Sequence, residues 1–97
     1  MQYQLLSQEE QDEIIVGFIL SQERDSFCHQ INLERYDGML KDLPEGQWKT
    51  QIGNLQAETL KRLAEVNSII EASRPKMPPA ERVESAKSRL LAKQGAR

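Results

Sequence analysis

The stretch that decides the fold is Asp42-Leu43-Pro44-Glu45-Gly46. Proline disfavours helical backbone in the residue before it, and glycine loosens the backbone that follows. No other proline occurs before position 75, and the residues on both sides are rich in helix-forming types. The stretch therefore predicts a turn that separates two long helices.

The segment before the turn predicts a helix from about Gln8 to Lys41. It starts at Ser7-Gln8-Glu9-Glu10, which is a capping box. In this motif the serine hydroxyl accepts the backbone N–H of Glu10, and the Glu10 carboxylate accepts the serine N–H. Acidic residues in the first turns also suit the positive end of the helix dipole. A helix of this length would span about 50 Å.

The segment after the turn predicts a second helix from about Gln47 to Ser73. Its expected apolar stripe consists of Ile52, Leu55, Thr59, Leu63, Val66 and Ile70. Folding it back places residue n of the first helix opposite roughly residue 88 − n of the second. The expected pairs are Leu40 with Trp48, Tyr36 with Ile52, Leu33 with Leu55, and Phe18 and Ile19 with Ile69 and Ile70. A polar layer is expected where residues 22–26 meet residues 62–66. The predicted fold is all-α, with a long antiparallel, coiled-coil-like hairpin in a domain of residues 1–73.

The C-terminal part predicts a separate arm of residues 74–97. Arg74-Pro75-Lys76-Met77-Pro78-Pro79 is expected to be a non-helical, extended and stiff linker. A short helix should follow from about Pro79 to Gln94, closed by Gly95. Its apolar stripe of Val83, Ala86 and Leu90 is narrow. Three alternatives remain open for this helix: it docks on the hairpin, it docks on a partner, or it frays.

The charge of the chain is unevenly distributed. Residues 1–45 hold three basic and ten acidic side chains, whereas residues 46–97 hold ten basic and five acidic ones. The last helix is basic, with Arg82, Lys87, Arg89, Lys93 and Arg97. Such asymmetry can steer a partner, or an antiparallel copy of the chain, into register.

The first helix carries more apolar surface than a second helix can cover. Its segment Ile14-Ile15-Val16-Gly17-Phe18-Ile19-Leu20 is apolar nearly all round. The missing cover must come from Tyr3, Leu5 and Leu6, from the C-terminal helix, or from another chain. Association with a protein partner, or between copies of the chain, is the expected outcome. The predicted partner-binding residues are Ile15, Phe18, Ile19, Leu20 and Trp48.

Catalytic chemistry finds little support in the sequence. His29 lies one turn after Asp25, but two ligands do not make a metal site, and Glu-x-x-His does not occur. Cys28 is adjacent to His29, yet neighbouring helical side chains diverge by about 100°, so a buried, inert thiol is expected. Tyr36 and Trp48 are expected to belong to the hairpin core in preference to an exposed anchor. The sequence predicts no enzyme activity, no cofactor, no metal and no small-molecule substrate.

The sequence favours a non-enzymatic protein-binding module, a small adaptor, inhibitor or assembly factor of the kind that bacteria and their viruses encode. The alternative is a nucleic-acid accessory protein that dimerises through the hairpin. It would contact phosphates with Arg82, Lys87, Arg89 and Lys93. A single cysteine and the lack of a long apolar run or leader predict a cytoplasmic protein that does not enter the membrane.

Overall fold

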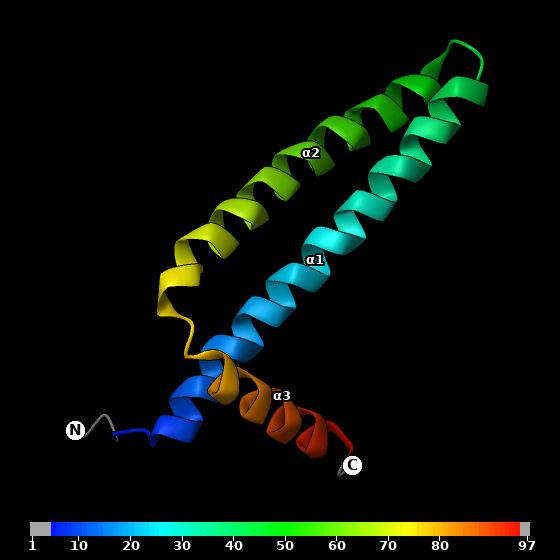
Figure 1. Cartoon of the computed structure of the whole chain (residues 1–97). Helices are drawn as coiled ribbons and strands as arrows, with labels where there is room; N and C mark the ends of the chain where they lie inside the picture. Colours follow the sequence, from blue (N-terminus) through cyan, green and yellow to red (C-terminus); the bar gives the residue numbers. More distant parts are fainter. Residues whose placement is uncertain (1–4, 96–97) are drawn as a thin grey trace. The chain divides into compact units, whose positions relative to one another are not determined.

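The structure is a computed structural model that describes residues 5–95. The described residues form three α-helices and one short 3₁₀ turn, without a strand (Figure 1). Helix α1 covers Gln8–Asp42, α2 covers Gln47–Ser73, the 3₁₀ helix η1 covers Arg74–Lys76 and α3 covers Ala80–Gly95. The predicted all-α fold and its helix boundaries are therefore confirmed to within one residue. Tyr3 and Arg97 lie outside the described residues.

The chain forms two compact units. The hairpin unit comprises Gln22–Glu71, and the terminal unit comprises the residues up to Ser21 together with those from Ala72 onwards. Helix α1 contributes to both, with its first part in the terminal unit and its second part in the hairpin unit.

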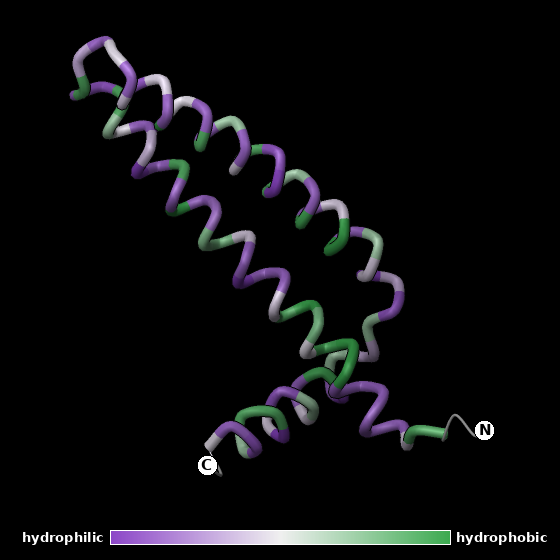
Figure 2. The backbone as a smooth tube through the Cα atoms, turned by 180° about the vertical axis from the view of Figure 1, so that it is seen from behind, coloured by the Kyte–Doolittle hydropathy of each residue, from purple (hydrophilic) through white to green (hydrophobic). Residues whose placement is uncertain are grey.

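In the hairpin unit, α1 and α2 pack side by side and run in opposite directions (Figure 1). Buried and half-buried residues recur on each helix at alternating steps of three and four, which is the spacing of a coiled-coil seam. We call these the seam positions: Gln22, Ser26, His29, Leu33, Tyr36 and Leu40 on α1, and Ile52, Gln56, Thr59, Leu63, Val66 and Ile70 on α2. Many of them are polar. Figure 2 shows hydrophobic and hydrophilic residues interspersed along both arms.

The seam corrects part of the expected apolar stripe. Leu55 was expected to face Leu33, but it is exposed, and Gln56 occupies the seam position instead. Trp48 was expected to pack on Leu40, yet 73% of its surface is exposed. Strict alternation of three and four selects residues 49, 52, 56 and 59, so both side chains fall one position outside the seam.

A hydrogen-bonded polar layer crosses the seam. The Ser26 hydroxyl donates to Asn67 Oδ1 at 3.1 Å and accepts from Gln30 Nε2 at 3.1 Å. The expected pairing placed Ser26 opposite Arg62, five residues earlier than Asn67, so the predicted layer exists but its register was wrong. Helical side chains lean toward the N-terminus of their own helix, and in an antiparallel pair this shifts contacting residues to higher numbers on the second helix.

The turn satisfies the ends of both helices. The Leu43 N–H donates to the Met39 carbonyl at 3.0 Å, and the Thr50 N–H donates to the Gly46 carbonyl at 3.1 Å. Gly46 has a φ of +148°, a backbone conformation that is open to glycine and strained for other residues. Glycine is therefore required at this position.

The linker before α3 departs from the expected extended form. Residues 74–76 make one 3₁₀ turn, closed by the Met77 N–H donating to the Arg74 carbonyl at 3.1 Å. A 3₁₀ turn is closed by one backbone N–H, three residues after the carbonyl that accepts it. Met77 supplies this N–H, which a proline would lack. Met77 itself is extended. The Pro79 carbonyl then accepts the N–H groups of Arg82 and Val83 in the first turn of α3.

Substitution of two glycines tests the turn. Gly46→Ala should lower the free energy of unfolding by about 1–2 kcal/mol, because alanine is strained at this φ. Gly38→Ala is the matched control at an exposed position of helix α1, where nothing lies within 4 Å of the added carbon. It should raise the free energy of unfolding by about 0.5–1 kcal/mol. Urea unfolding followed by circular dichroism measures both, and equal effects of the two substitutions would contradict this account of the turn.

Candidate functional site

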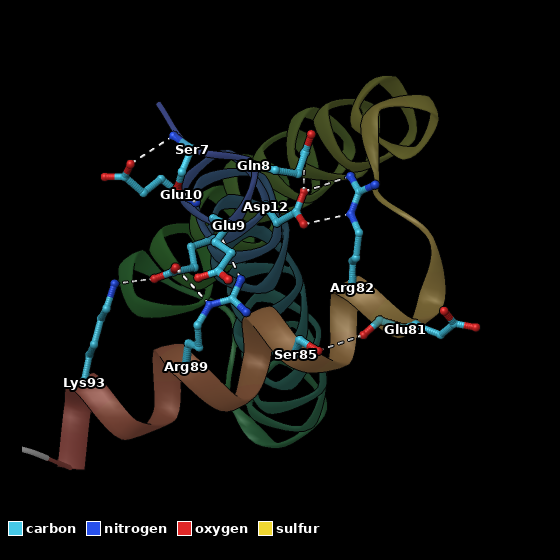
Figure 3. Close-up of polar contacts among 11 residues, drawn as sticks. Ser7, Gln8, Glu9, Glu10, Asp12, Glu81, Arg82, Ser85, Arg89 and Lys93 are labelled. Carbon is cyan, nitrogen blue, oxygen red and sulfur yellow. Dashed lines mark hydrogen bonds and ion pairs between the residues drawn. The ribbon is translucent and has the colours of Figure 1, made fainter. Parts of the chain in front are cut away.

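In the terminal unit, α1 starts at the predicted capping box. The Glu10 N–H donates to Ser7 Oγ at 3.1 Å, and the Ser7 N–H donates to Glu10 Oε1 at 3.0 Å (Figure 3). The backbone hydrogen bond from Ser7, followed by that from its hydroxyl, lowers the pKa of Glu10. This cap fixes where α1 begins and therefore which side chains reach its buried face.

Two carboxylates on the buried face of α1 bind three cations of α3, and we call these five residues the ion cluster: Asp12, Glu13, Arg82, Arg89 and Lys93. Arg82 makes a two-pronged contact with Asp12, from Nε to Oδ2 at 2.9 Å and from Nη2 to Oδ1 at 3.1 Å (Figure 3). Gln8 Nε2 also donates to Asp12 Oδ1 at 2.9 Å. Asp12 is 4% exposed, and these donors compensate for the loss of water around its charge.

Glu13 completes the ion cluster with two cations. Arg89 Nε donates to Glu13 Oε2 at 3.1 Å, and Lys93 Nζ binds the other oxygen. Arg89 also donates from Nη2 to the Glu9 backbone carbonyl at 3.3 Å. Three turns of α3 are thereby tied to two turns of α1.

The cations of α3 set the protonation of both carboxylates. The hydrogen bond from Arg82 is the main cause that lowers the pKa of Asp12, and it raises the pKa of Arg82 in turn. Hydrogen bonds from Lys93 and then Arg89 lower the pKa of Glu13. Burial opposes both carboxylate shifts but is outweighed. Both groups therefore hold their negative charge more strongly than they would in an unfolded chain.

An apolar layer lies beside the ion cluster. Val16, Ile19 and Ala86 are buried. Leu90 packs over Gly17, and a carbon added at Gly17 would make ordinary van der Waals contact with Leu90 Cδ1, at 3.6 Å. Of the three alternatives for the C-terminal helix, the structure shows the first: α3 docks on the chain's own α1. Leu5 and Leu6 stay exposed and add little cover.

The predicted partner-binding residues divide into three groups. Ile19 is 4% exposed, so a partner cannot reach it in this structure, and its assignment to the partner-binding surface is corrected. Ile15 and Leu20 are half-buried. Phe18, in the terminal unit, and Trp48, in the hairpin unit, are exposed. Ile19 is covered because it lies on the same stripe of α1 as Asp12 and Val16, which are also buried.

The predicted phosphate-binding residues meet acidic groups of the same chain. Arg82, Arg89 and Lys93 bind the carboxylates of the ion cluster. Lys87 Nζ lies 3.9 Å from Glu84 Oε2 on the exposed side of α3. From the sequence, Asp12 and Glu13 were assigned only to the acidic first turns of the helix, although the opposite charges of the two chain ends gave a signal for their contact with α3.

The two residues considered for chemistry lie in the hairpin unit. His29 occupies a seam position and is half-buried. Cys28 is exposed, so the expectation of a buried thiol was wrong. The seam explains this result, because residue 28 directly precedes a seam position and points away from it. Within residues 5–95, no three His, Cys, Asp or Glu side chains are grouped closely enough to hold a metal ion.

Comparison with protein-family models, curated proteins and solved structures finds no match for this chain. No helix in the described part of the chain combines the length and the apolar character needed to span a bilayer.

The ion cluster predicts how stability depends on pH. The pKa values of Asp12 and Glu13 lie below their ordinary values of 3.8 and 4.5, so their contribution is complete above about pH 4.5 and is lost as pH falls through the lowered values. Asp12→Asn with Glu13→Gln should lower stability at pH 7 and flatten its loss between about pH 5 and pH 2. Urea unfolding at fixed ionic strength measures this dependence. Glu84→Gln, at an exposed site on α3, is the control, and an unchanged acid dependence in the double variant would contradict the role of the ion cluster.

Proposed function

We propose that the chain is a non-enzymatic protein-binding module, a small adaptor, inhibitor or assembly factor, that binds a protein partner through an apolar surface of α1. The observation that carries this proposal is the exposure of Ile14 and Phe18 while α3 is docked, with 59% and 43% of their surfaces accessible. The non-enzymatic part rests on the sequence, which contains no catalytic motif.

Ile14 and Phe18 form one ridge of α1. They are four residues apart, so they lie above one another on the helix surface. At about 100° per residue, this ridge points away from the stripe that bears Asp12, Val16 and Ile19. An isoleucine and a phenylalanine at this spacing are typical anchors of a helix that binds in the groove of a larger protein. Half-buried Ile15 precedes Phe18 by three residues and lies at the margin of the ridge, whereas half-buried Leu20 lies on the other side of α1.

An acidic side chain near this ridge would set specificity more than affinity. Glu10 precedes Ile14 by one turn and is exposed. Exposed charges at the rim of an interface mainly guide approach and exclude wrong partners, because water screens their attraction. The partner's groove is therefore expected to be apolar with a basic rim.

Phe18→Asp tests the proposal. A tagged chain should capture its partner from the cells that express it, and the variant should bind the captured protein about 30-fold or more weakly, because a charge replaces a central aromatic anchor. Circular dichroism should show unchanged helix content, since Phe18 is exposed. Ser88→Asp adds the same charge on an exposed site of α3 and serves as the control. Equal binding by Phe18→Asp and wild type would remove this ridge from consideration.

The nucleic-acid alternative stays a prediction that no specific contact favours. Three of its four cations point at carboxylates of the same chain, and the ion cluster would have to open before they could bind phosphates. Retention of the full chain on duplex DNA or RNA at low salt, abolished by removal of residues 75–97, would support that alternative.

A further inference from the structure

A second apolar surface lies on one side of the hairpin unit. The residues that directly precede alternate seam positions fall on one side of both helices, because the helices are antiparallel. We call this side the Trp48 face, and it contains Asp25, Asn32 and Met39 of α1 and Trp48, Leu55, Arg62 and Ile69 of α2. Its four large hydrophobic residues are all exposed, with accessible fractions of 44% for Met39, 73% for Trp48, 47% for Leu55 and 40% for Ile69.

The opposite side of the hairpin is more polar. The corresponding positions there hold Glu23, Gln30, Asp37, Gly53 and Asn67, with Leu60 as the one large hydrophobic residue among them. Phe27, which is 62% exposed, lies further out on this side, so two exposed large hydrophobic residues stand against four on the Trp48 face. The exposed apolar surface is thus biased toward the Trp48 face. A two-helix layer shows such a bias when its more apolar face packs on a further layer.

We infer that the Trp48 face binds a second, antiparallel copy of this chain, making a four-helix layer pair from two hairpins. The inference rests on the proposed function and deepens it. It names a second copy as the partner of the Trp48 face, while the Ile14–Phe18 ridge binds another protein. Two features of the face argue for a copy: its area and its charges.

The area suits a stable dimer. About 24 residues of each helix, rising 1.5 Å per residue, give a face about 36 Å long, and two helices make it about 20 Å wide. Each copy would therefore contribute about 700 Å², and the pair about 1,400 Å², which is within the range of specific protein interfaces.

The charges of the face are complementary to themselves. Arg35 and Glu58 lie one turn from the face residues on the same side. An antiparallel copy can bring Arg35 opposite Asp25 of the other copy, which requires a two-fold centre near residue 30 of α1. Glu58 and Arg62 pair within each chain, with Arg62 Nε 3.3 Å from Glu58 Oε1. An antiparallel copy can bring this pair against the reversed pair of the other copy, which requires a centre near residue 60 of α2. Because Ser26 lies beside Asn67, these two centres are within one helical turn of each other along the hairpin. One two-fold axis therefore serves both pairs.

A parallel copy would be poorly matched. It would bring α1 of one copy against α2 of the other at the same distance from the turn, which places Asp25 near Glu65 of the other copy. That contact occurs twice and is repulsive, since like charges across an interface disfavour association. The same register brings Arg35 level with Glu58 of the other copy, so two repulsions offset the two attractions of the parallel arrangement. The antiparallel arrangement instead gives opposite charges at four places and brings Trp48 within about one turn of the other copy's Ile69.

Charge reversal tests the inference on the full chain. Sedimentation equilibrium should give about twice the chain mass of 11.1 kDa. Arg35→Glu should weaken dimerisation about tenfold or more, and adding Asp25→Arg to that variant should restore it. Arg24→Glu makes the same charge change at an exposed residue that is absent from the Trp48 face, so it should leave dimerisation unchanged. Arg35→Glu should leave binding of the protein captured through Phe18 unchanged, which separates this test from that of the proposed function.

The single cysteine reports the direction of the two copies. In the antiparallel dimer the two Cys28 residues lie on either side of the axis, about 6 Å apart along the helix direction. A short bismaleimide should therefore give a covalent dimer in wild type and far less in Arg35→Glu. A monomeric wild-type chain, a dimer indifferent to Arg35→Glu, or a dimer without the Cys28 cross-link would each overturn the inference. A monomer whose Trp48 fluorescence shifts only with the protein captured through Phe18 would assign the face to that protein instead, and would also overturn it.

Discussion

A seam between two helices hides one stripe of each helix and no more, and the rest of this structure follows from that limit. In the hairpin unit, half of the stripe is polar, with Ser26, His29, Gln56 and Thr59 among its members. The hairpin therefore gains little from apolar burial and uses hydrogen bonds such as Ser26 to Asn67 to fix its register. Large apolar residues are left beside the seam, where they are free to serve recognition.

The terminal unit solves the same problem with charge. Helix α3 has few apolar residues for its contact with α1: Ala86 is buried, and Leu90 lies near Gly17 of α1. The ion cluster supplements this contact and fixes the position of α3 along α1 through the two-pronged pair of Arg82 and Asp12. Buried ion pairs give geometric specificity more readily than net stability. Docking of α3 is therefore well defined and also sensitive to conditions that alter charge.

Much of the fold could be predicted from local sequence signals. The capping box at Ser7, the breaker around Pro44, the prolines before Ala80 and the closing Gly95 placed the helix boundaries, because these signals act through neighbouring backbone groups. The pairing register and the choice of Gln56 over Leu55 could not be read in the same way. They depend on the direction in which side chains lean and on the continuity of the seam, which are properties of two helices together.

The candidate surfaces were predicted in part. Phe18 and Trp48 were recognised as apolar and are exposed, whereas Ile19 was assigned to a partner although the terminal unit buries it. Sequence alone could not decide which face of the apolar segment α3 would cover, because the contact joins residues at opposite ends of the chain. The opposite charges of the two chain ends were visible in the sequence. The pairing of Asp12 with Arg82 shows that these charges determine which face of α1 lies against α3.

The distance in sequence between the partners of the ion cluster has a consequence during synthesis. Asp12 and Arg82 are 70 residues apart. At about 5–20 residues per second, a ribosome needs roughly 4–14 s to make the intervening chain. Asp12, Glu13 and Gly17 leave the exit tunnel before their contacts on α3 exist and remain without them until α3 has been made. The start of α1 is thus more exposed in the nascent chain than in the finished protein, at the stage when a chaperone or another nascent copy is most able to bind it.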